Sequence, residues 1–253
     1  MKKNADFLPL LLMVALSALV AGCTTARVEY DRMTGTQYPQ PVTVSGDQVD
    51  LTSIYWQGER IVTVTEDNTN IAVLTGPANP LDPNQYDYIN RAEIETLETA
   101  NRADPIGSST FNCGLWNRFT CTRYHLYGVV VNHYWEGDCG TACRDTGLLG
   151  VMYAGASGIT NDRSAFVGFW RNSTVNSDNG KFLRSTAHEI GHAFNNNHCD
   201  GDGSMTIMNQ TGVVGNTYNY QFSATSLDHL QNHADTAVWP GLGARDYACP
   251  HSH

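Results

Sequence analysis

Apolar and polar residues alternate in several short runs of the chain, which is the pattern of strands with one buried face. Three such runs lie in the first part of the chain, at residues 48–56, 60–66 and 71–75. Residues 83–100 instead carry apolar side chains at helical spacing, which predicts a helix. We therefore expect a β-rich N-terminal part at residues 45–104 that ends with the first helix.

The second part, residues 105–253, contains three further apolar runs followed by a long helical pattern. The runs predict strands at residues 126–135, 148–153 and 165–170. The long helical pattern can begin at Asp178, a good capping residue. The apolar face of this long helix consists of Leu183, Ala187, Ile190 and Phe194. A second, short helix is predicted at residues 226–234. This arrangement of strands and helices predicts an α+β fold.

The long helix carries histidines and a glutamate at a spacing that suits a catalytic metal site. His188 and His192 are one turn apart, so both imidazoles leave the same helix face and can bind one zinc ion. His198 is the natural third ligand, which leaves the fourth position of a tetrahedral zinc to water. Glu189 can take the proton of that water as the water attacks a carbonyl group. The segment therefore predicts a water-activating zinc site.

Other interpretations of this segment remain open. Asp200 or Asp202 is an alternative third ligand, although imidazole is the commoner zinc donor. A thermolysin-like site takes its third ligand from a later glutamate, and no glutamate follows Glu189. An amphipathic helix with solvent-facing histidines is the alternative to a metal site. A further pair, His229 and His233, has no third partner at a matching spacing and is expected to be structural.

Residues 188–198 read HEIGHAFNNNH and resemble the metzincin zinc peptidases, whose pattern is HExxHxxGxxH. Asn195 stands where the family has a glycine that ends the helix in a left-handed conformation, and asparagine is the next most tolerant residue there. The family also has a methionine turn beneath the metal, and Ile-Met-Asn around Met208 is similar to its reprolysin-like form. The resemblance implies that Met208, rather than Met205, packs under the site.

The same resemblance implies a fold and a way of binding substrate. Metzincins have a twisted mixed β-sheet, a zinc-binding active-site helix and a small C-terminal subdomain. The family's strand two elements before that helix lies at the sheet edge and pairs with extended substrate, because an edge offers peptide groups to another strand. The alternative is an inner strand without a substrate role. The implied edge residues here are Gly150, Val151, Met152 and Tyr153.

The N-terminus resembles a bacterial lipoprotein signal. Two lysines precede an apolar run at residues 7–20, and Val-Ala-Gly then leads to Cys23. We expect residues 1–22 to be removed, Cys23 to receive lipid, and residues 23–44 to form a polar tether. Thr24 after the cysteine favours the outer membrane if the cell has one. A plain secretory signal or an anchor helix is the alternative, although a spanning helix needs about 20 apolar residues.

The other six cysteines agree with export, because an even number suits disulfides in an oxidising compartment. Six cysteines allow about fifteen pairings, so the sequence leaves their connectivity open. A cysteine zinc site around residues 139–143 is an alternative that lacks a second ligand pair. The close spacings favour Cys113 with Cys121 and Cys139 with Cys143, which leaves Cys199 to pair with Cys249.

The chain has 253 residues and a formal net charge of −10, without a cluster of lysines or arginines. Nucleic-acid binding is therefore not expected, because it requires a basic surface. We expect a monomer that contacts the membrane through its lipid and acts on protein or peptide substrates. The patterns together predict an exported, lipid-anchored zinc endopeptidase. The alternatives are a catalytically silent peptide-binding lipoprotein and an amidase that acts on cell-wall peptides.

Overall fold

The protein is represented here by a computed structural model. The structure describes residues 24–67, 70–71, 88–89, 91–103, 107–113, 119–134, 149–153, 163, 165–170, 177–199, 205–210, 219–234 and 238–239. Within these ranges, no helix has the length and apolar character that crossing a membrane requires.

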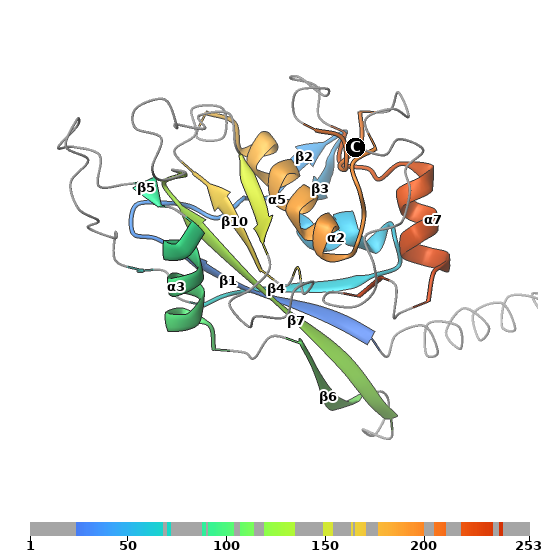
Figure 1. Ribbon diagram of the computed structural model, residues 1–253. Helices are drawn as coiled ribbons and strands as arrows, with labels where there is room; N and C mark the ends of the chain where they lie inside the picture. Colours follow the sequence, from blue (N-terminus) through green and yellow to red (C-terminus); the bar gives the residue numbers. More distant parts are fainter. Residues whose placement is uncertain are drawn as a thin grey trace, which may run out of the picture.

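A six-stranded sheet forms the centre of the fold (Figure 1). Its strands are β1 (Thr24–Arg32), β4 (Ile61–Glu66), β6 (Gly107–Cys113), β7 (Phe119–Val131), β9 (Gly150–Tyr153) and β10 (Ala165–Phe169). Five of them lie in the order β4-β1-β7-β10-β9, and β6 pairs with the first half of β7. The pairs along this order are parallel up to β10, whereas β9 and β6 are antiparallel to their neighbours.

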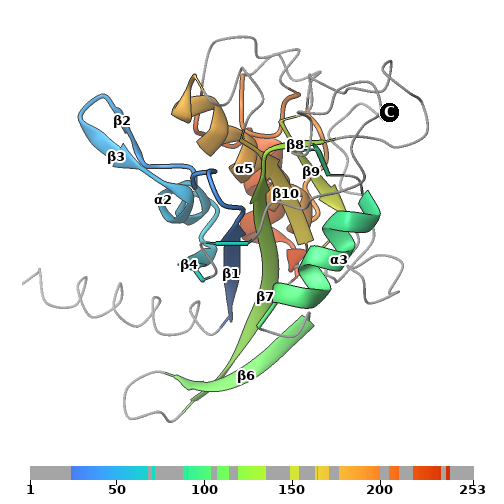
Figure 2. The same ribbon diagram turned by 90° about the vertical axis from the view of Figure 1, so that its left-hand side faces the viewer.

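Helices cover both faces of the sheet (Figures 1 and 2). One face carries α2 (Leu51–Trp56), α5 (Asn179–Ala193) and α7 (Ala224–Asn232), and the other carries α3 (Arg91–Asn101). Side chains of β7 alternate between the two cores, as the two-residue period of a strand requires. Leu126 and Val130 pack with α5, whereas Tyr127 and Val129 pack with α3. The sheet is therefore buried on both faces at its centre.

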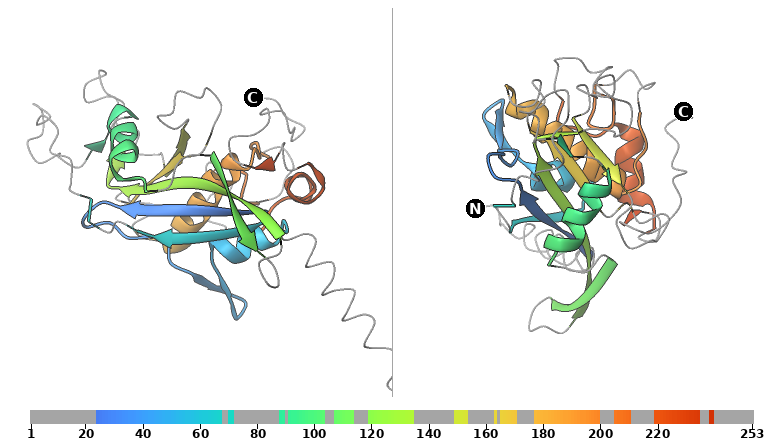
Figure 3. Two further views of the ribbon diagram at one scale, coloured as in Figure 1. Left: turned by 90° about the horizontal axis from the view of Figure 1, so that it is seen from below. Right: turned by 60° about the vertical axis from the view of Figure 1, so that its left-hand side comes forward.

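Two short strand pairs lie outside the main sheet. Strands β2 (Val42–Val44) and β3 (Asp47–Val49) form a hairpin, and β5 (Tyr88–Ile89) is parallel to β8 (His133–Tyr134). Ser45 and Gly46 connect β2 to β3 with φ of 53° and 97°, as a tight hairpin turn requires. Figure 3 shows this hairpin beside α2, on the opposite side of the sheet from α3.

Strand β1 corrects the prediction of a tether over residues 23–44. Thr24 already pairs with β7, and β1 lies between β4 and β7 with most of its side chains buried. The polar residues that suggested a tether are accommodated inside the protein. Glu29 accepts a hydrogen bond from a backbone N–H just after α3, and Asp31 accepts one from the Tyr127 hydroxyl at 3.0 Å. Hydrogen-bonded carboxylates can be buried, so this segment forms a central strand.

The strand predicted over residues 48–56 is wrong for most of its length, because residues 51–56 form α2. A reciprocal cap starts this helix. The Ser53 N–H donates to the Asp50 carboxylate at 2.7 Å, and the Asp50 N–H donates to the Ser53 hydroxyl at 2.8 Å. The buried side chains of α2 are Leu51, Ile54 and Tyr55. This spacing is that of one helix face, which the alternation of apolar residues concealed.

Other predicted elements agree more closely with the structure. Strands β4, β9 and β10 lie inside the ranges predicted for them, and α7 overlaps its predicted range. Strand β7 begins at Phe119, well before the predicted range 126–135. The helix predicted over residues 83–100 begins only at Arg91, after β5. Residues 72–75 lie outside the described part of the chain.

The coarse fold prediction is confirmed, since a mixed, mostly parallel sheet is combined with a few helices. The boundary expected after residue 104 does not divide this sheet. Strands β1 and β4 come before it and β7, β9 and β10 after it, yet all five lie in one continuous order.

Candidate functional site

Helix α5 carries the predicted metal ligands and is held to the core along its opposite face. Its start is capped by Asp178, whose carboxylate accepts from the N–H groups of Gly180 at 2.9 Å and Lys181 at 3.3 Å. The Tyr55 hydroxyl of α2 donates to the Ala187 carbonyl at 2.5 Å. The four apolar residues predicted to face the core, Leu183, Ala187, Ile190 and Phe194, are all buried. These contacts fix which way the other face points.

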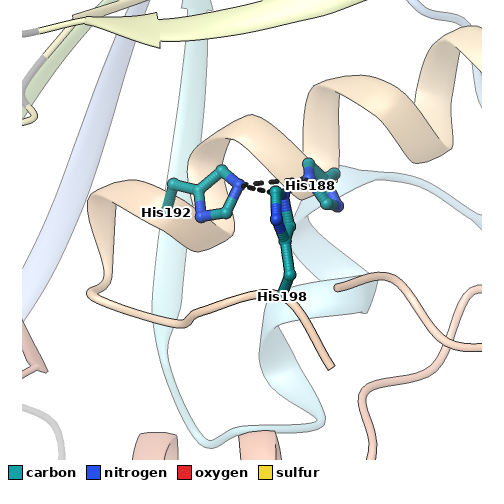
Figure 4. Close-up of side chains that lie close together, drawn as sticks. All are labelled: His188, His192 and His198. Atoms are coloured by element: carbon teal, nitrogen blue, oxygen red, sulfur yellow. Dashed lines mark hydrogen bonds between the residues drawn. The ribbon is translucent and has the colours of Figure 1, made fainter. Parts of the chain in front are cut away.

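Three histidines converge on one point at the open face of α5 (Figure 4). The Nε2 atoms of His188, His192 and His198 lie 3.1 Å from one another in all three pairs. His188 is buried, whereas the other two are half-buried. The structure therefore brings together the three residues that the spacing selected, and their ligand atoms are close enough to share one metal ion.

The end of α5 explains how His198 returns to the other two histidines. Asn195 adopts the left-handed conformation, with φ of 64°. Its N–H donates to the His192 carbonyl and the Asn196 N–H donates to the Gly191 carbonyl, both at 3.0 Å. This pair of bonds is the Schellman motif, which ends a helix and reverses the chain. Asn195 thus takes the conformation that the sequence pattern assigns to its position.

The outer nitrogens of two histidines fix which ring nitrogen carries a proton. His188 Nδ1 lies 2.7 Å from the Ile207 carbonyl, and His192 Nδ1 lies 2.8 Å from the Asn196 carbonyl. A carbonyl only accepts, so each Nδ1 donates, and in a neutral ring the Nε2 then carries a lone pair. Burial lowers the pKa of His188 well below its usual range, and the neighbouring His192 lowers this pKa further. The His188 ring is therefore neutral.

The Nδ1 atom of His198 also has a hydrogen-bond partner, which in this case is a side chain. This Nδ1 lies 3.0 Å from the amide nitrogen of Gln210. The nitrogen and oxygen of an amide exchange places by a half-turn of the group, and in that orientation the Gln210 oxygen accepts from His198 Nδ1. All three Nε2 lone pairs then point to one place. Lone pairs at 3.1 Å repel one another unless a cation lies between them. The arrangement is that of a metal site with three nitrogen ligands.

Glu189 lies between α5 and the edge strand β9. It is buried, and the backbone N–H of Met152 donates to its carboxylate. Burial raises the pKa of Glu189 to about 8, and the hydrogen bond from Met152 partly opposes this rise. A cation held by the adjacent histidines would favour the ionised carboxylate. The side chain can therefore exchange a proton near neutral pH, as a general base requires.

The edge position predicted for β9 is observed within the described residues, because β9 is the last strand in the sheet order. Phe169 N–H donates to the Leu149 carbonyl, so in this antiparallel register the backbone groups of Gly150 and Met152 point away from β10. Val151 and Tyr153, the other predicted edge residues, pair with Val167 and Ala165 of β10.

The segment 205–210 lies under the histidines, where the sequence predicted a methionine turn. Met208 is fully buried, whereas Met205 is 45% exposed. A Cβ added to Gly191 on α5 would collide with the Met208 sulfur. The methionine thus packs directly against the helix segment between His188 and His192.

Two residues of this region were missed by the sequence analysis. The guanidinium of Arg184 on α5 donates to backbone carbonyls of the turn, and Asn209 links the turn to the segment after His198. The sequence signal for Arg184 is its spacing, one turn before His188 and on the same helix face. Asn209 belongs to the Ile-Met-Asn sequence that resembles the family's methionine turn, but its role was not predicted because its partner at Cys199 becomes a neighbour only after the chain folds.

The structure places some of the other predicted residues. Cys121 and Cys199 are disulfide-bonded. His229 is buried and its Nε2 lies 2.8 Å from the Phe194 carbonyl, as expected of a structural histidine. Asp200 and Asp202 lie outside the described residues. The same holds for Cys23, Cys139, Cys143, Cys249 and the side chain of Cys113.

Comparisons with known proteins give a weak similarity. No family model and no curated protein matches the chain. Among solved structures, the chain is similar to a zinc-dependent peptidase from Methanocorpusculum labreanum (strain Z), with a TM-score of 0.41 and 16% identity. The match covers 81% of this chain and 100% of the other. A similarity of this size says nothing about activity, so a function can be inferred only from the geometry of the site.

Proposed function

We propose that the protein is a zinc-dependent endopeptidase of the metzincin type, with His188, His192 and His198 as metal ligands and Glu189 as general base. One observation carries the proposal. Three imidazole nitrogens converge beside a buried carboxylate at the open edge of a sheet.

The donor set favours zinc over harder cations. Neutral imidazole nitrogens are preferred by zinc and neighbouring transition metals, whereas magnesium and calcium prefer oxygen ligands. Tetrahedral zinc with Zn–N bonds of about 2.0–2.1 Å places its nitrogen ligands roughly 3.3 Å apart. The observed separations of 3.1 Å are close to this value. The outer hydrogen bonds of the histidines also resemble those that orient zinc ligands in general.

A tetrahedral zinc held by three protein ligands keeps its fourth position open for catalysis. Three ligands from the described residues form the cluster. Cys199 is the nearest soft donor in the sequence, and it is disulfide-bonded, so it is not available as a thiolate ligand. A structural zinc site usually has four protein ligands, whereas a catalytic one has three. This difference supports an enzyme rather than a silent binding lipoprotein.

The chemistry assigned to the chain's own residues is proton transfer and orientation. Zinc, when bound, supplies a Lewis acid that lowers the pKa of water and polarises the scissile carbonyl. The Glu189 carboxylate takes a proton from the attacking water and returns it to the leaving amine. The Met152 N–H holds this carboxylate beside the histidines. Without the Glu189 carboxylate, peptide hydrolysis has no proton carrier.

Substrate binding is assigned to the open side of β9. The Met152 N–H is bonded to Glu189. The backbone groups of Gly150 and the Met152 carbonyl, which also point away from β10, can pair with an extended peptide. This pairing reads the backbone rather than side chains, so it suits protein or peptide substrates of varied sequence. It also brings the scissile bond next to Glu189, which contacts the same strand.

The location of the activity is proposed from the sequence. The signal-like N-terminus and Cys23 favour export with a lipid anchor in the cell envelope, in the outer membrane where the cell has one. Disulfides at Cys121 and Cys199 agree with an oxidising compartment. The proposed pairings remain Cys113 with Cys121, Cys139 with Cys143, and Cys199 with Cys249, in a monomeric protein.

Incubation of the purified protein with a diverse peptide library tests the proposal. Mass spectrometry identifies the cut sites for three samples: the protein with zinc, the protein after chelation, and the chelated protein to which zinc has been restored. We expect cleavage at internal peptide bonds that chelation abolishes and zinc restores. Zinc binding without cleavage would favour the silent binding lipoprotein, and cleavage confined to cell-wall peptides would favour the amidase.

A further inference from the structure

Arg184 is a buried cation in the helix that carries the histidines. It lies on α5 one turn before His188, and only 3% of it is exposed. A guanidinium can be buried at this depth only if its N–H groups find acceptors, because desolvation of a charge is costly. The acceptors therefore show what this side chain does.

Three of the acceptors belong to one short turn. Arg184 Nη2 donates to the carbonyls of Thr206 at 2.8 Å and Ile207 at 3.2 Å, and also to the carbonyl of Asn209. These residues flank Met208 on both sides. All three bonds come from one NH2 group with two hydrogens, so one hydrogen is shared between two of the carbonyls. The charge of the guanidinium strengthens each of these bonds.

The same turn contacts two of the three histidines. The Ile207 carbonyl accepts from His188 Nδ1 at 2.7 Å, so one oxygen is shared by Arg184 and a metal ligand. At the other end, the side chain of Gln210 lies 3.0 Å from His198 Nδ1. The turn therefore determines the orientation of both rings.

Asn209 connects this turn to the segment that follows His198. Its amide oxygen accepts from the Thr206 N–H and hydroxyl at 2.7 and 2.8 Å, which closes the turn. Its amide nitrogen donates to the Cys199 carbonyl at 2.8 Å, and the Cys199 N–H donates to the Met208 carbonyl at 3.2 Å. The third ligand is thus attached to the turn through main chain as well as through Gln210.

We propose that Arg184 is a positioning residue of the metal centre, which acts through the turn 206–210 on His188 and His198. This inference rests on the proposed metal site. Arg184 contacts backbone carbonyls of the turn. A guanidinium stays protonated and offers no lone pair to a metal, so its effect on the metal centre is exerted through the turn. Substitution of Arg184 frees the turn that supplies the hydrogen-bond partners of His188 Nδ1 and His198 Nδ1. Loss of such contacts to metal-binding histidines typically weakens metal binding roughly 10- to 100-fold.

The test compares the zinc affinity of the full chain and its variants by competition with a chromogenic chelator, with folding checked by circular dichroism. Arg184→Met removes the charge and keeps the volume, and Arg184→Lys keeps the charge without the planar fork. Val62→Ala on β4 is the control, because it opens a cavity in the core at the far edge of the sheet. It separates loss of stability from loss of ligand orientation.

We expect Arg184→Met to weaken zinc binding roughly 10- to 100-fold and Arg184→Lys to weaken it less. Val62→Ala should bind zinc within about threefold of the original protein although it melts at a lower temperature. Gln210→Ala is a change near the surface and should also weaken zinc binding. This variant provides the test if Arg184→Met does not fold. Unchanged zinc affinity in folded Arg184→Met overturns the inference, and so does unchanged affinity in Gln210→Ala if Arg184→Met is unfolded. Both results leave the proposed peptidase function intact, whereas an original protein that binds no zinc overturns both.

Discussion

Gly150 on β9 lies so close to Glu189 that a Cβ on Gly150 would come 2.9 Å from the Glu189 Cγ and 3.2 Å from its Oε1. The Val167 carbonyl would lie 3.1 Å away on the strand side. An added methyl group is therefore confined between the backbone of β10 and the carboxylate. Because the backbone is fixed by strand pairing, the carboxylate is the group that has to move.

Gly150→Ala should consequently impair catalysis without impairing metal binding. We expect cleavage to fall roughly 10- to 100-fold, because a displacement of about 1 Å at a reacting group has this effect. Zinc affinity should stay within about threefold, since the three atoms nearest the added methyl group belong to Glu189 and Val167 and not to a histidine ligand. Cleavage rates at saturating zinc and zinc affinity by chelator competition provide the two measurements.

Gly35→Ala is the matched control for this change. A Cβ there meets no atom within 4 Å, and the positive φ of 84° costs stability only. Cleavage by this variant should equal that of the original protein. Equal activity in Gly150→Ala would show that Glu189 is not held in its working position by this contact.

The left-handed conformation of Asn195 gives a second prediction. Asn195→Ala and Asn195→Gly both remove the side chain, but only glycine adopts a φ of 64° without steric cost. The alanine variant should be less stable than the glycine variant by about 1–2 kcal/mol. Urea unfolding in the presence of chelator measures this difference without a contribution from metal. Equal stability of the two variants would contradict the assigned role of this turn.

His229 predicts how stability depends on pH. Burial, followed by the charges of His233 and Arg60, lowers the pKa of His229 to about 4, against about 6.5 in an unfolded chain. Between these values the unfolded chain binds a proton that the folded protein does not bind. The stability that His229 contributes is therefore complete above pH 6.5 and is lost as the pH falls towards 4, by up to about 3 kcal/mol.

The comparison of His229→Gln with the original protein isolates this effect. Both proteins contain every other titrating group, so the difference in their unfolding free energies should change between pH 6.5 and 4. We expect the variant to lose less stability over this interval. Parallel pH profiles for the two proteins would exclude the neutral, buried state of His229.

Zinc should stabilise the fold through His198. A ligand at a concentration of about 100 times its dissociation constant stabilises the folded state by about 2.7 kcal/mol, which for a chain of this size raises the melting temperature by roughly 5–10 °C. His198→Ala should lose this response, and Asp200→Ala should keep it. Melting curves with zinc and with chelator distinguish them. The reverse result would make an aspartate the third ligand.

The candidate site was predictable from sequence because its residues are close together in the chain. His188 and His192 lie one turn apart on a helix with an apolar opposite face, and these two periodicities need no tertiary information. Asn195 at the position of a left-handed residue then predicted where the helix ends. The return of His198 follows from that ending.

The errors occurred where distant partners decide the structure. Glu29 and Asp31 made β1 look like a solvated tether, and their burial depends on donors that lie far along the chain. The strand predicted before Trp56 is a helix because Asp50 and Ser53 cap it. Arg184 was missed since its acceptors come from a turn that reaches it only in the folded protein.

Replacement of Glu189 tests the central claim most directly, because the proposal gives this carboxylate the only proton transfer. Glu189→Gln keeps the size of the side chain and removes its basicity. Cleavage of a peptide substrate by the zinc-loaded protein should fall roughly 100- to 10,000-fold, while zinc affinity stays within about threefold. A Glu189→Gln variant that binds zinc and retains full cleavage would contradict the account.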